Sequence, residues 1–449
     1  MKQENKIEIM AVGGYEEVGR NMTAVKVGNE VIILDMGWNL EKVLTHLGQY
    51  NPKEHSLKDM IEIGAYPDYT YMGSWVPLVK AILVSHAHLD HIEAVPKLAG
   101  MFPQAEIIGP AFAIEVLKHS LKEEPARIPN KISVMNAGQR RRIGGFDVEF
   151  INVTHSTPQS VMIALHTSAG TIIYTGDWKL DNTPPIGNKT NIQRLKKIAE
   201  EEGVKVLLAD TVRIEREQKT PSESMVKEML KDVLWGVEND ENAIFVTTFS
   251  SHIGRLKNIK EIGEKMGRKI IFLGRSMEMY IRAAQAVGIA DLTQGSEVFG
   301  RRKSIAAALK KVQKNQSEYL VVITGHQGEP NSVLDRISRK ELPFQFDEWD
   351  TLIFSSEIIP APVNEANRAE LERRLKPTKV RMFKDIHVSG HAAREDHRDL
   401  LKILKPEHYI PFHGDIRKLA SAANLAKDMG YELGKTVHIM QNGQKVEIK

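Results

Sequence analysis

Four side chains that can bind metal ions fall within six consecutive positions, 86–91. They are His86, His88, Asp90 and His91. The apolar run 81–84 directly precedes them and predicts a buried strand. Because side chains alternate along a strand, its end can direct His86 and His88 to one side, while the following turn presents Asp90 and His91 to a neighbouring point. Imidazole nitrogen and carboxylate oxygen at this spacing predict two adjacent metal ions, with zinc or manganese favoured.

Three further candidate ligands follow strands elsewhere in the chain, at His155, Asp177 and His413. Two metal ions need about six to eight donor positions when bridging groups are counted. We therefore expect one metal on His86, His88 and His155, a second on Asp90, His91 and His413, and Asp177 as the bridge. A hydroxide between metals about 3.5–4 Å apart would be the nucleophile, and both ions would stabilise charge on an attacked phosphate. Taken singly, His155 and Asp177 would more often be an ordinary loop residue and a turn former.

Asp35 ends another predicted strand, 23–35, where a buried carboxylate needs a partner because an unpaired buried charge is costly. We expect Asp35 to hold one of the ligand histidines through the ring nitrogen that does not bind metal. The predicted elements explain how such distant positions meet. Up to about residue 175 strands predominate, and ligands placed at strand ends converge on one edge of a sheet.

The pattern of predicted elements changes near residue 192. Helices and strands then alternate, which predicts a parallel α/β unit. The predicted helices are 192–201, 222–234, 252–266, 276–287 and 363–374, and the predicted strands are 204–209, 243–248, 269–273, 319–323 and 351–354. A strand at 380–384, a helix at 394–404 and a strand at 407–411 follow. Residues 38–75 look irregular and aromatic, and a helix is expected at about 92–100. The alternating block therefore looks inserted into one strand-rich domain.

Composition excludes several classes of protein. The 449 residues are 42% hydrophobic and 27% charged, which is typical of a folded multidomain chain. Lysine and arginine number 61 against 58 acidic residues, a formal charge of +3, so nucleic-acid binding would need a local basic groove. The chain has no cysteine, which excludes disulfides and thiolate catalysis. We find neither a signal sequence nor an apolar run that spans a bilayer, so we expect a cytoplasmic protein with no membrane partner.

Small residues separate the two histidines of His387-Val388-Ser389-Gly390-His391. Their backbone amides could approach an anion, and His391 could donate a proton to a leaving oxygen or neutralise a phosphate. A helix cap and turn is an equally good explanation of Ser389 and Gly390. The turn 324–330 and the segment Ser250-Ser251-His252 follow strands of the alternating block, and the latter offers a second anion site at a helix N-terminus. The short basic runs 140–142 and 301–303 are more often solvated faces.

The motifs at 86–91, with Asp35, His155 and Asp177, resemble the signature of the metallo-β-lactamase superfamily. The α/β block, Asp210 at the end of Leu-Ala-Asp, Ser-Gly-His at 389–391 and Pro-Phe-His-Gly at 411–414 resemble the added motifs of its β-CASP branch. Within that branch the segments listed next are similar to ribonuclease J. They are Gly13-Gly14, 17–22, the Thr-Gly-His-Gln-Gly-Glu-Pro turn at 324–330 and His-Val-Ser-Gly-His at 387–391. The resemblance covers essentially the whole chain.

The resemblance implies an α/β fold, a metallo-β-lactamase αββα four-layer sandwich with an inserted β-CASP domain built on a parallel sheet. We expect the sandwich at 1–207 and 383–449 and the insert at 208–382. It implies a metal-dependent ribonuclease that degrades single-stranded RNA from a 5′-monophosphate end, with an RNA channel between the domains and endonuclease activity in some members. Two divalent ions are implied, Zn²⁺ first, with Mn²⁺ or Mg²⁺ as alternatives.

The family's roles are carried over to matching positions of this chain. Catalysis is assigned to His391, Asp90, Asp177 and Asp210. Substrate binding is assigned to His387, Val388, Ser389, Gly390, His391, Ser250, Ser251 and His252. The chain departs from the usual pattern after Asp210, where it has Thr-Val-Arg-Ile-Glu, which leaves the role of that loop open. It also ends soon after the third motif, as in the shorter archaeal form, so a homodimer cannot be inferred from the bacterial contacts.

Three alternatives remain. An endoribonuclease of RNA 3′-end processing would share the β-CASP motifs, although its archaeal versions usually carry RNA-binding domains before the core. A generic metallo-β-lactamase hydrolase would share the ligands but would not need the insert. A non-enzymatic RNA-binding module would have no use for an intact ligand set.

Overall fold

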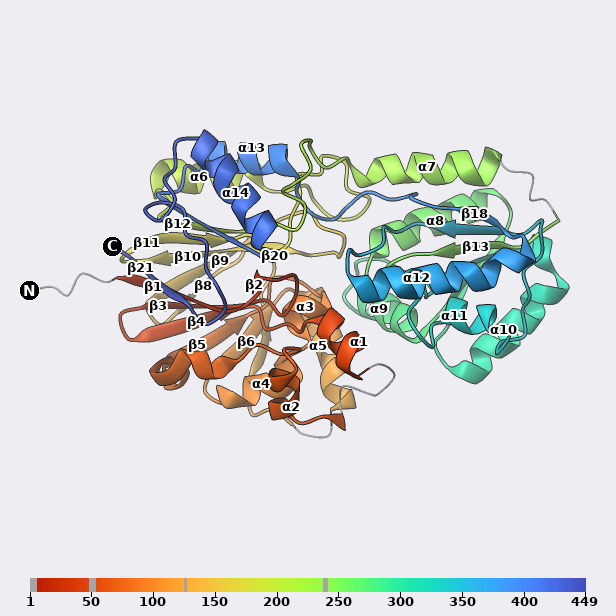
Figure 1. The fold of residues 1–449 in the computed structure, drawn as a ribbon, viewed down its shortest axis with the longest axis horizontal. Helices are drawn as coiled ribbons and strands as arrows, with labels where there is room; N and C mark the ends of the chain where they lie inside the picture. Colours follow the sequence, from red (N-terminus) through yellow and green to blue (C-terminus); the bar gives the residue numbers. More distant parts are fainter. Residues whose placement is uncertain (1–5, 48–53, 125–126, 237–240) are drawn as a thin grey trace, which may run out of the picture. The chain divides into compact units, whose positions relative to one another are not determined.

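The computed structural model describes residues 6–47, 54–124, 127–236 and 241–449, and the chain divides into two compact units. Unit 1 comprises Met1–Asn182, Asn188–Thr220 and Gly390–Lys449, and unit 2 comprises Thr183–Gly187 and Pro221–Ser389. The elements of each unit can be followed in Figure 1. The second unit is thus an insertion into the first, as the sequence predicts.

The boundaries of unit 2 lie later than the predicted insert at 208–382. Residues 208–210 belong to strand β12 (Val206–Asp210), which pairs in parallel with β11 (Gly170–Tyr174) and β19 (His408–Phe412) of unit 1. At the other end, Ser355 Oγ donates to the Ile386 carbonyl at 2.9 Å, within unit 2. Hydrogen bonds rather than motif positions therefore set both boundaries.

Two stacked sheets form the core of unit 1. The first has the order β21-β1-β3-β4-β5-β6-β7 and the second β19-β12-β11-β10-β9-β8. Their remaining strands are β1 Ile7–Gly13, β3 Met22–Val27, β4 Glu30–Leu34, β5 Val79–Leu83, β6 Glu106–Gly109, β7 Ile132–Val134, β21 Lys445–Ile448, β8 Arg140–Ile143, β9 Phe146–Asn152 and β10 Val161–Thr167. A short pair, β2 (Tyr15–Glu16) with β20 (Gly414–Asp415), brings the N-terminal region beside His413.

Apart from the edge strand β8, the strands of the second sheet are largely buried on both faces, so most of their residues are apolar. In β9, Val148 and Phe150 contribute to the core shared with the first sheet. The alternate residue Ile151 belongs to a separate core with the helices. These helices are α6 Ile192–Glu201, α13 Arg394–Leu404 and α14 Ile416–Asp428. On the outer face of the first sheet lie α2 Leu57–Glu62, α4 Val95–Leu98 and α5 Ala111–Glu123, which gives four layers (Figure 1). The predicted αββα sandwich is confirmed.

Unit 2 contains one six-stranded sheet in the order β15-β14-β16-β13-β17-β18, and every pair in it is parallel. The strands are β13 Ile244–Thr247, β14 Lys269–Leu273, β15 Ser296–Phe299, β16 Tyr319–Ile323, β17 Thr351–Phe354 and β18 Arg381–Phe383. The helices are α7 Glu223–Gly236, α8 Ile253–Lys265, α9 Arg275–Ala286, α10 Arg302–Lys314, α11 Val333–Ser338 and α12 Pro362–Leu375. This is the predicted parallel α/β block without its first helix and strand, because α6 and β12 belong to unit 1.

Several elements differ from the sequence prediction. The helix expected at 92–100 is divided between α3 (Leu89–Ile92), α4 and a 3-10 turn, with Pro96 in the first turn of α4. Within 38–75, expected to be irregular, the described residues form α1 (Leu40–Leu47), α2 and part of a 3-10 segment, Tyr69–Leu78, while 48–53 lie outside them. Strand β15 and helices α10 and α11 are additional elements of unit 2.

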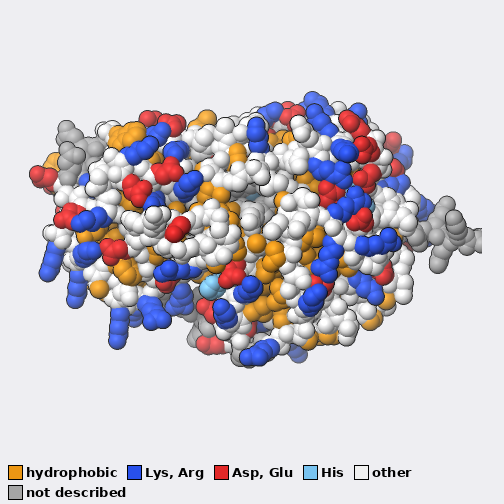
Figure 2. All heavy atoms as spheres, turned by 180° about the vertical axis from the view of Figure 1, so that it is seen from behind, with side chains coloured by type: hydrophobic (Ala, Val, Ile, Leu, Met, Phe, Trp, Pro, Cys, Tyr) orange, Lys and Arg blue, Asp and Glu red, His pale blue; other side chains and the backbone are white. Residues whose placement is uncertain are grey.

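Within the described parts of the chain, every helix is too short or too polar to traverse a lipid bilayer. On the face shown in Figure 2, lysine and arginine side chains are interspersed with aspartate and glutamate. The mixture agrees with the formal charge of only +3. That face therefore carries no continuous cationic surface.

A buried carboxylate fastens helix α6 to the second sheet. Glu149 in β9 is 6% exposed and accepts two hydrogen bonds from Arg194 of α6, at 2.6 and 2.7 Å. His166 of β10 lies 3.1 Å from the same carboxylate. Burial opposes ionisation, but hydrogen bonds from Arg194 and His166 lower the pKa of Glu149 to about 2 from its ordinary 4.5. The ionised form is therefore favoured by the fold.

Replacing Glu149 by Gln should lower the free energy of unfolding by about 1–3 kcal/mol at pH 7, because Arg194 would lose its two-fold contact with Glu149 and keep only Glu202, at 3.5 Å. The folded pKa is below the unfolded one, so this contribution is complete above pH 4.5 and disappears as the pH falls toward 2. Urea unfolding of both proteins at several pH values measures the difference. Glu200→Gln, an exposed site on the same helix, should change stability by less than about 0.5 kcal/mol. A Glu149 effect that did not shrink at low pH would contradict the ionic origin.

Candidate metal centre

The predicted ligands lie where strands of the two sheets of unit 1 end. Asp35 follows β4, the cluster at 86–91 follows β5, and Asp177 follows β11. His413 comes directly after β19. Strands β4 and β5 are parallel to each other, as are β11, β12 and β19, so their carboxyl ends lie at common edges. Asp35 and His413 adopt positive φ angles of 58° and 56°, which turn the chain sharply after the strand.

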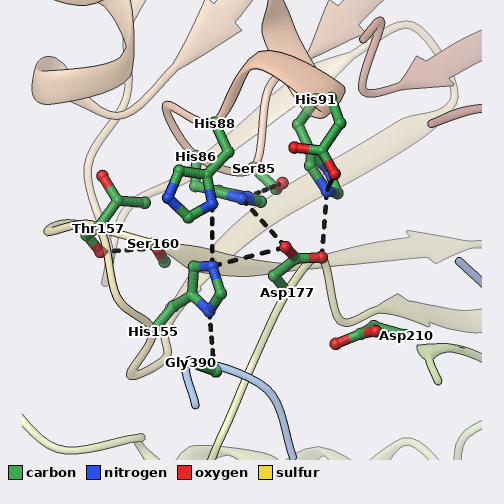
Figure 3. Close-up of polar contacts among 12 residues, drawn as sticks. Ser85, His86, His88, His91, His155, Thr157, Ser160, Asp177, Asp210 and Gly390 are labelled. Atoms are coloured by element: carbon green, nitrogen blue, oxygen red, sulfur yellow. Dashed lines mark hydrogen bonds and ion pairs between the residues drawn. The ribbon is translucent and has the colours of Figure 1, made fainter. Parts of the chain in front are cut away.

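One group of ligands surrounds a single oxygen of Asp177 (Figure 3). The Nε2 atoms of His86 and His155 each lie 3.5 Å from Asp177 Oδ2. His88 Nδ1 lies 3.1 Å from His155 Nε2. One ligand atom from each of these four residues falls within 4.8 Å of the others. The structure therefore brings together the first set of ligands predicted from the sequence.

A second group surrounds the other oxygen of Asp177. His91 Nε2 lies 3.1 Å and His413 Nε2 3.7 Å from Asp177 Oδ1, and His413 Nε2 is 3.3 Å from Asp90 Oδ2. These four residues also fall within 4.8 Å of one another. Asp177 belongs to both groups, which is the bridging position predicted for it. His413 differs from His91 in the hydrogen bond at Nδ1. The Gly19 amide donates to His413 Nδ1 at 3.3 Å, whereas His91 Nδ1 donates to Asp35.

Hydrogen bonds outside the groups leave ring lone pairs for a cation. His91 Nδ1 donates to Asp35 at 2.7 Å, and His155 Nδ1 donates to the Gly390 carbonyl at 2.7 Å. The Ser85 hydroxyl donates to Asp35, so its lone pair accepts from His86 Nδ1 at 2.9 Å. Each ring therefore presents an unprotonated Nε2 toward Asp177 when neutral. Among the residues that the structure describes, His86 Nε2 is buried without a hydrogen-bond partner, which fits a residue built to hold metal.

Asp35 fixes the geometry of both groups. It is fully buried, and its two oxygens accept from the Ser85 amide and hydroxyl, His91 Nδ1 and the Tyr174 hydroxyl at 2.7–2.8 Å. Tyr174 belongs to the second sheet, whereas Asp35 and Ser85 follow strands of the first. The role predicted for Asp35 agrees with these contacts. Ser85 and Tyr174 were not among the predicted site residues, and only the position of Ser85 beside His86 gives a sequence signal for one of them.

The charges of the group suit a divalent cation. Burial lowers the pKa of His88 and His155 well below 6.5, so both rings are neutral. Burial disfavours the ionised form of Asp177, but the surrounding histidines, His91 first, hold its pKa well below its usual range. Burial likewise opposes charge on His91, yet Asp177, Asp90 and Asp35 raise the pKa of His91 well above 6.5. A cation that binds at His91 therefore displaces a proton.

A third set of residues adjoins the ligands. His391 Nδ1 is 2.8 Å from Asp210 Oδ2, and His391 Nε2 is 3.8 Å from Asp177 Oδ2. Burial opposes protonation, but Asp210 and then Asp177 raise the pKa of His391 to about 9. The other oxygen of Asp210 accepts from the Val212 amide at 2.8 Å, and Thr211 Oγ1 donates to the Phe412 carbonyl beside His413. The loop after Asp210 therefore contacts the surroundings of the metal centre despite its unusual sequence.

The alternative explanation of Ser389 and Gly390 as a helix cap is not supported. Helix α13 begins at Arg394, and Ala393 is its N-cap residue. Gly390 is instead constrained by His155, because a Cβ at Gly390 would lie 2.9 Å from the imidazole ring. The absence of a side chain therefore allows the Gly390 carbonyl to accept from His155.

The other residues assigned to substrate binding belong to unit 2. Ser250 and Ser251 follow β13, and His252 is the N-cap residue of α8. His387, Val388 and Ser389 follow β18. Ser251, Val388 and Ser389 are buried, whereas His387 is half-buried. Their assignment to substrate remains a proposal.

Replacing Asp35 by Asn should weaken metal binding about 10–100-fold, because the amide cannot accept all four hydrogen bonds or polarise His91. Metal content at fixed free metal concentrations, set by a chelator buffer, measures the change. Glu149→Gln is the matched control: it also removes a buried carboxylate from unit 1 but contacts no predicted ligand. Equal metal loss in both variants would show that general destabilisation, and not Asp35, is responsible. Asp177→Ala, which removes the bridge itself, should bind less metal than either.

Comparison with known proteins places this geometry in a family. Three family models match: "Beta-lactamase superfamily domain" at residues 70–221, "Ribonuclease J, beta-CASP domain" at 241–370 and "Zn-dependent metallo-hydrolase RNA specificity domain" at 377–440. A crystal structure of a protein of unknown function from Enterococcus faecalis V583 has a TM-score of 0.66 and 16% identity, covering 98% of this chain and 100% of that chain. At that identity the likeness shows the fold alone.

Full-length relatives share the sequence as well. Ribonuclease J of Methanocaldococcus jannaschii is 47% identical over 442 residues, 98% of this chain and 98% of the relative. Ribonuclease J of Pyrococcus abyssi is 42% identical over 99% of this chain and 98% of the relative. Ribonuclease J of Sinorhizobium meliloti is 29% identical over 100% of this chain and 75% of its own length. With its two ligand groups on Asp177 and its inserted β-CASP unit, the chain belongs to the ribonuclease J family.

Proposed function

We propose that the chain is a metal-dependent ribonuclease that degrades single-stranded RNA from a 5′-monophosphate end in the 5′-to-3′ direction. The observation that carries the proposal is the convergence of six ligand side chains on the two oxygens of Asp177, with His391 beside them, in a chain of the ribonuclease J family. The direction of degradation and the preferred end rest on the family resemblance. A cytoplasmic location is part of the proposal and agrees with a chain that has no cysteine.

Two divalent cations would be held by the two ligand groups that share Asp177. The donors are imidazole nitrogens and carboxylate oxygens, which suit Zn²⁺ and also Mn²⁺, while Mg²⁺ is less suited to imidazole. When bound, such ions supply a lowered pKa of water for attack and neutralise charge on a phosphate. The protein keeps His86, His91 and His155 oriented through Asp35, Ser85 and the Gly390 carbonyl.

His391 is placed to act on the scissile phosphate. Its Nδ1 is fixed by Asp210, and its Nε2 points toward the Asp177 side of the centre. The side chain is 20% exposed, whereas Asp210 is 1% exposed. In the site without metal, Asp210 and then Asp177 raise the pKa of His391 to about 9, so the ring carries a proton there at neutral pH. His391 can therefore neutralise the phosphate or donate that proton to the leaving oxygen.

The direction of degradation is tested with RNA labelled at its 5′ end and carrying a monophosphate, a triphosphate or a hydroxyl there. Labelled mononucleotide should be the first product, and the monophosphate substrate should be degraded fastest. The reactions are run with Zn²⁺, Mn²⁺ and Mg²⁺ in turn. Internal fragments as the first product would instead indicate an endonuclease. Hydrolysis of lactams or thioesters without any cleavage of RNA would indicate a generic hydrolase of the superfamily.

Replacing His391 by Ala should slow the chemical step by about 10²–10⁴-fold, as expected for loss of a general acid. Metal content should stay at the wild-type value, because the two ligand groups that share Asp177 are complete without His391. Single-turnover cleavage together with elemental analysis separates the two effects. If His391→Ala loses one equivalent of metal, the residue is a ligand and its role as an acid is wrong.

A further inference from the structure

A fully buried arginine, Arg255 of α8, lies behind the proposed substrate segment of unit 2. All five of its N–H donors are used. Nε and Nη2 donate to the two oxygens of Glu223 at 2.7 and 2.6 Å. Nη1 donates to the Ser355 carbonyl at 2.8 Å and to His387 Nδ1 at 2.7 Å, and the second Nη2 proton is directed to the Val388 carbonyl at 3.3 Å. Arg255 thus connects two helices with the segment that follows β18.

The contact with His387 determines where that ring carries its proton. A guanidinium can only donate and stays charged in proteins, so Nδ1 of His387 must be the acceptor. The single proton of the neutral ring is then on Nε2. The Val388 carbonyl is held by the same guanidinium. Two successive residues of the segment are therefore oriented by one side chain.

The partner of Arg255 also reaches the second proposed substrate segment. Glu223 Oε2 lies 3.3 Å from His252 Nε2, and the Arg255 amide donates to His252 Nδ1 at 3.3 Å. Burial opposes charge on Glu223, but Arg255 and His252 hold its pKa well below 4.5. The segments 250–252 and 387–389 are therefore joined through one buried ion pair.

We propose that Arg255, paired with Glu223, is a positioning residue for the end of the RNA: it fixes His387 with its proton on Nε2 and holds Val388, so that the segment 387–389 presents donors to a terminal phosphate. This proposal rests on the function proposed above, together with the assignment of the unit 2 residues 387–389 to substrate binding. Arg255 acts through these residues and need not touch RNA itself.

A purely structural role would place the contacts elsewhere. Arg268 gives the comparison within the same unit: it is 6% exposed, and its Nη1 donates to the carbonyls of Asn242 and Tyr319. Tyr319 begins β16 and Asn242 precedes β13, so Arg268 braces the amino ends of strands. Arg255 instead donates to His387 and Val388, in the segment after the carboxyl end of β18. A buried ion pair is often no more stabilising than an apolar pair of similar volume, so stability alone does not account for Arg255 and Glu223.

The first test observes the His387 ring directly. Protein labelled with ¹⁵N-histidine is examined by long-range ¹H–¹⁵N spectra, and the His387 signal is identified by its loss in His387→Gln. Wild type should show an unprotonated Nδ1 and a protonated Nε2. In Arg255→Lys, an ammonium with three donors cannot serve both Glu223 and the segment. The ring should then populate the other tautomer or protonate. Unchanged His387 signals in Arg255→Lys would overturn the proposal.

The second test measures selectivity for the RNA end. The ratio of kcat/KM for 5′-monophosphate over 5′-hydroxyl RNA should fall about 10–100-fold in Arg255→Lys, as for a displaced positioning group. The double variant Arg255→Gln/Glu223→Gln should show the same loss without leaving a buried charge unpaired. Arg268→Lys should keep the wild-type ratio. Thermal unfolding of each variant verifies that it is folded at the assay temperature.

The two tests separate the two proposals. A changed ring with an unchanged selectivity ratio would overturn the positioning role of Arg255. A wild-type protein that does not distinguish 5′-monophosphate from 5′-hydroxyl RNA would overturn the recognition of the 5′ end, and the role of Arg255 in it. In that case the ring spectra would still show whether Arg255 sets the proton of His387.

Discussion

The carboxylate of Asp35 is the contact on which the metal centre depends. It lies at zero exposure between the two sheets of unit 1, and four donors surround it. An uncompensated charge at a fully buried position would lower the free energy of unfolding by several kcal/mol, so the fold depends on these four hydrogen bonds. Because they come from His91, Ser85 and Tyr174, the same contact aligns the sheets and sets the proton positions of two ligand rings. The hydrogen bonds of Asp35 therefore contribute both to the stability of unit 1 and to the orientation of the ligand histidines.

Without metal, the electrostatic field of the centre favours protonation of His91 and His391. Asp177 is ionised and enclosed by imidazoles, and His91 and His391 have raised pKa values in its field. Burial gives His88 and His155 the opposite tendency, so these rings stay neutral and keep their lone pairs. Both rings pair through Nδ1 with a further buried carboxylate, Asp35 for His91 and Asp210 for His391. They differ in the distance of Nε2 from Asp177, which is 3.1 Å for His91 and 3.8 Å for His391, and the proposed division between ligand and acid rests on that difference.

Much of this arrangement could be predicted from the sequence because strand ends carry the ligands and alternate side chains point together. The grouping of His86, His88 and His155 apart from Asp90, His91 and His413 follows from that rule and agrees with the distances observed. The supporting contacts could not be predicted in this way. Tyr174 and Ser85 meet Asp35 only because two sheets stack, and the sequence separation of Tyr174 from Asp35 leaves no local signal.

The division of the helix expected at 92–100 had a signal in Pro96 that favours a new first turn. Helix α10 also had a sequence signal, because its buried residues recur at helical spacing. They are Ile305, Ala308, Leu309 and Val312, and the basic run 301–303 before them drew attention away from this pattern.

The two units orient their functional side chains by the same means. In unit 1 a buried carboxylate accepts from the ring nitrogen that faces away from the site, and so leaves a lone pair for a cation. In unit 2 a buried guanidinium donates to the ring nitrogen of His387, and so leaves a proton for an anion. The sign of the buried partner determines whether a neutral histidine acts as acceptor or donor. A metal site and a phosphate site can therefore be built from the same residue type. Asp35 and Arg255, which need touch neither ligand, are what make the histidines different.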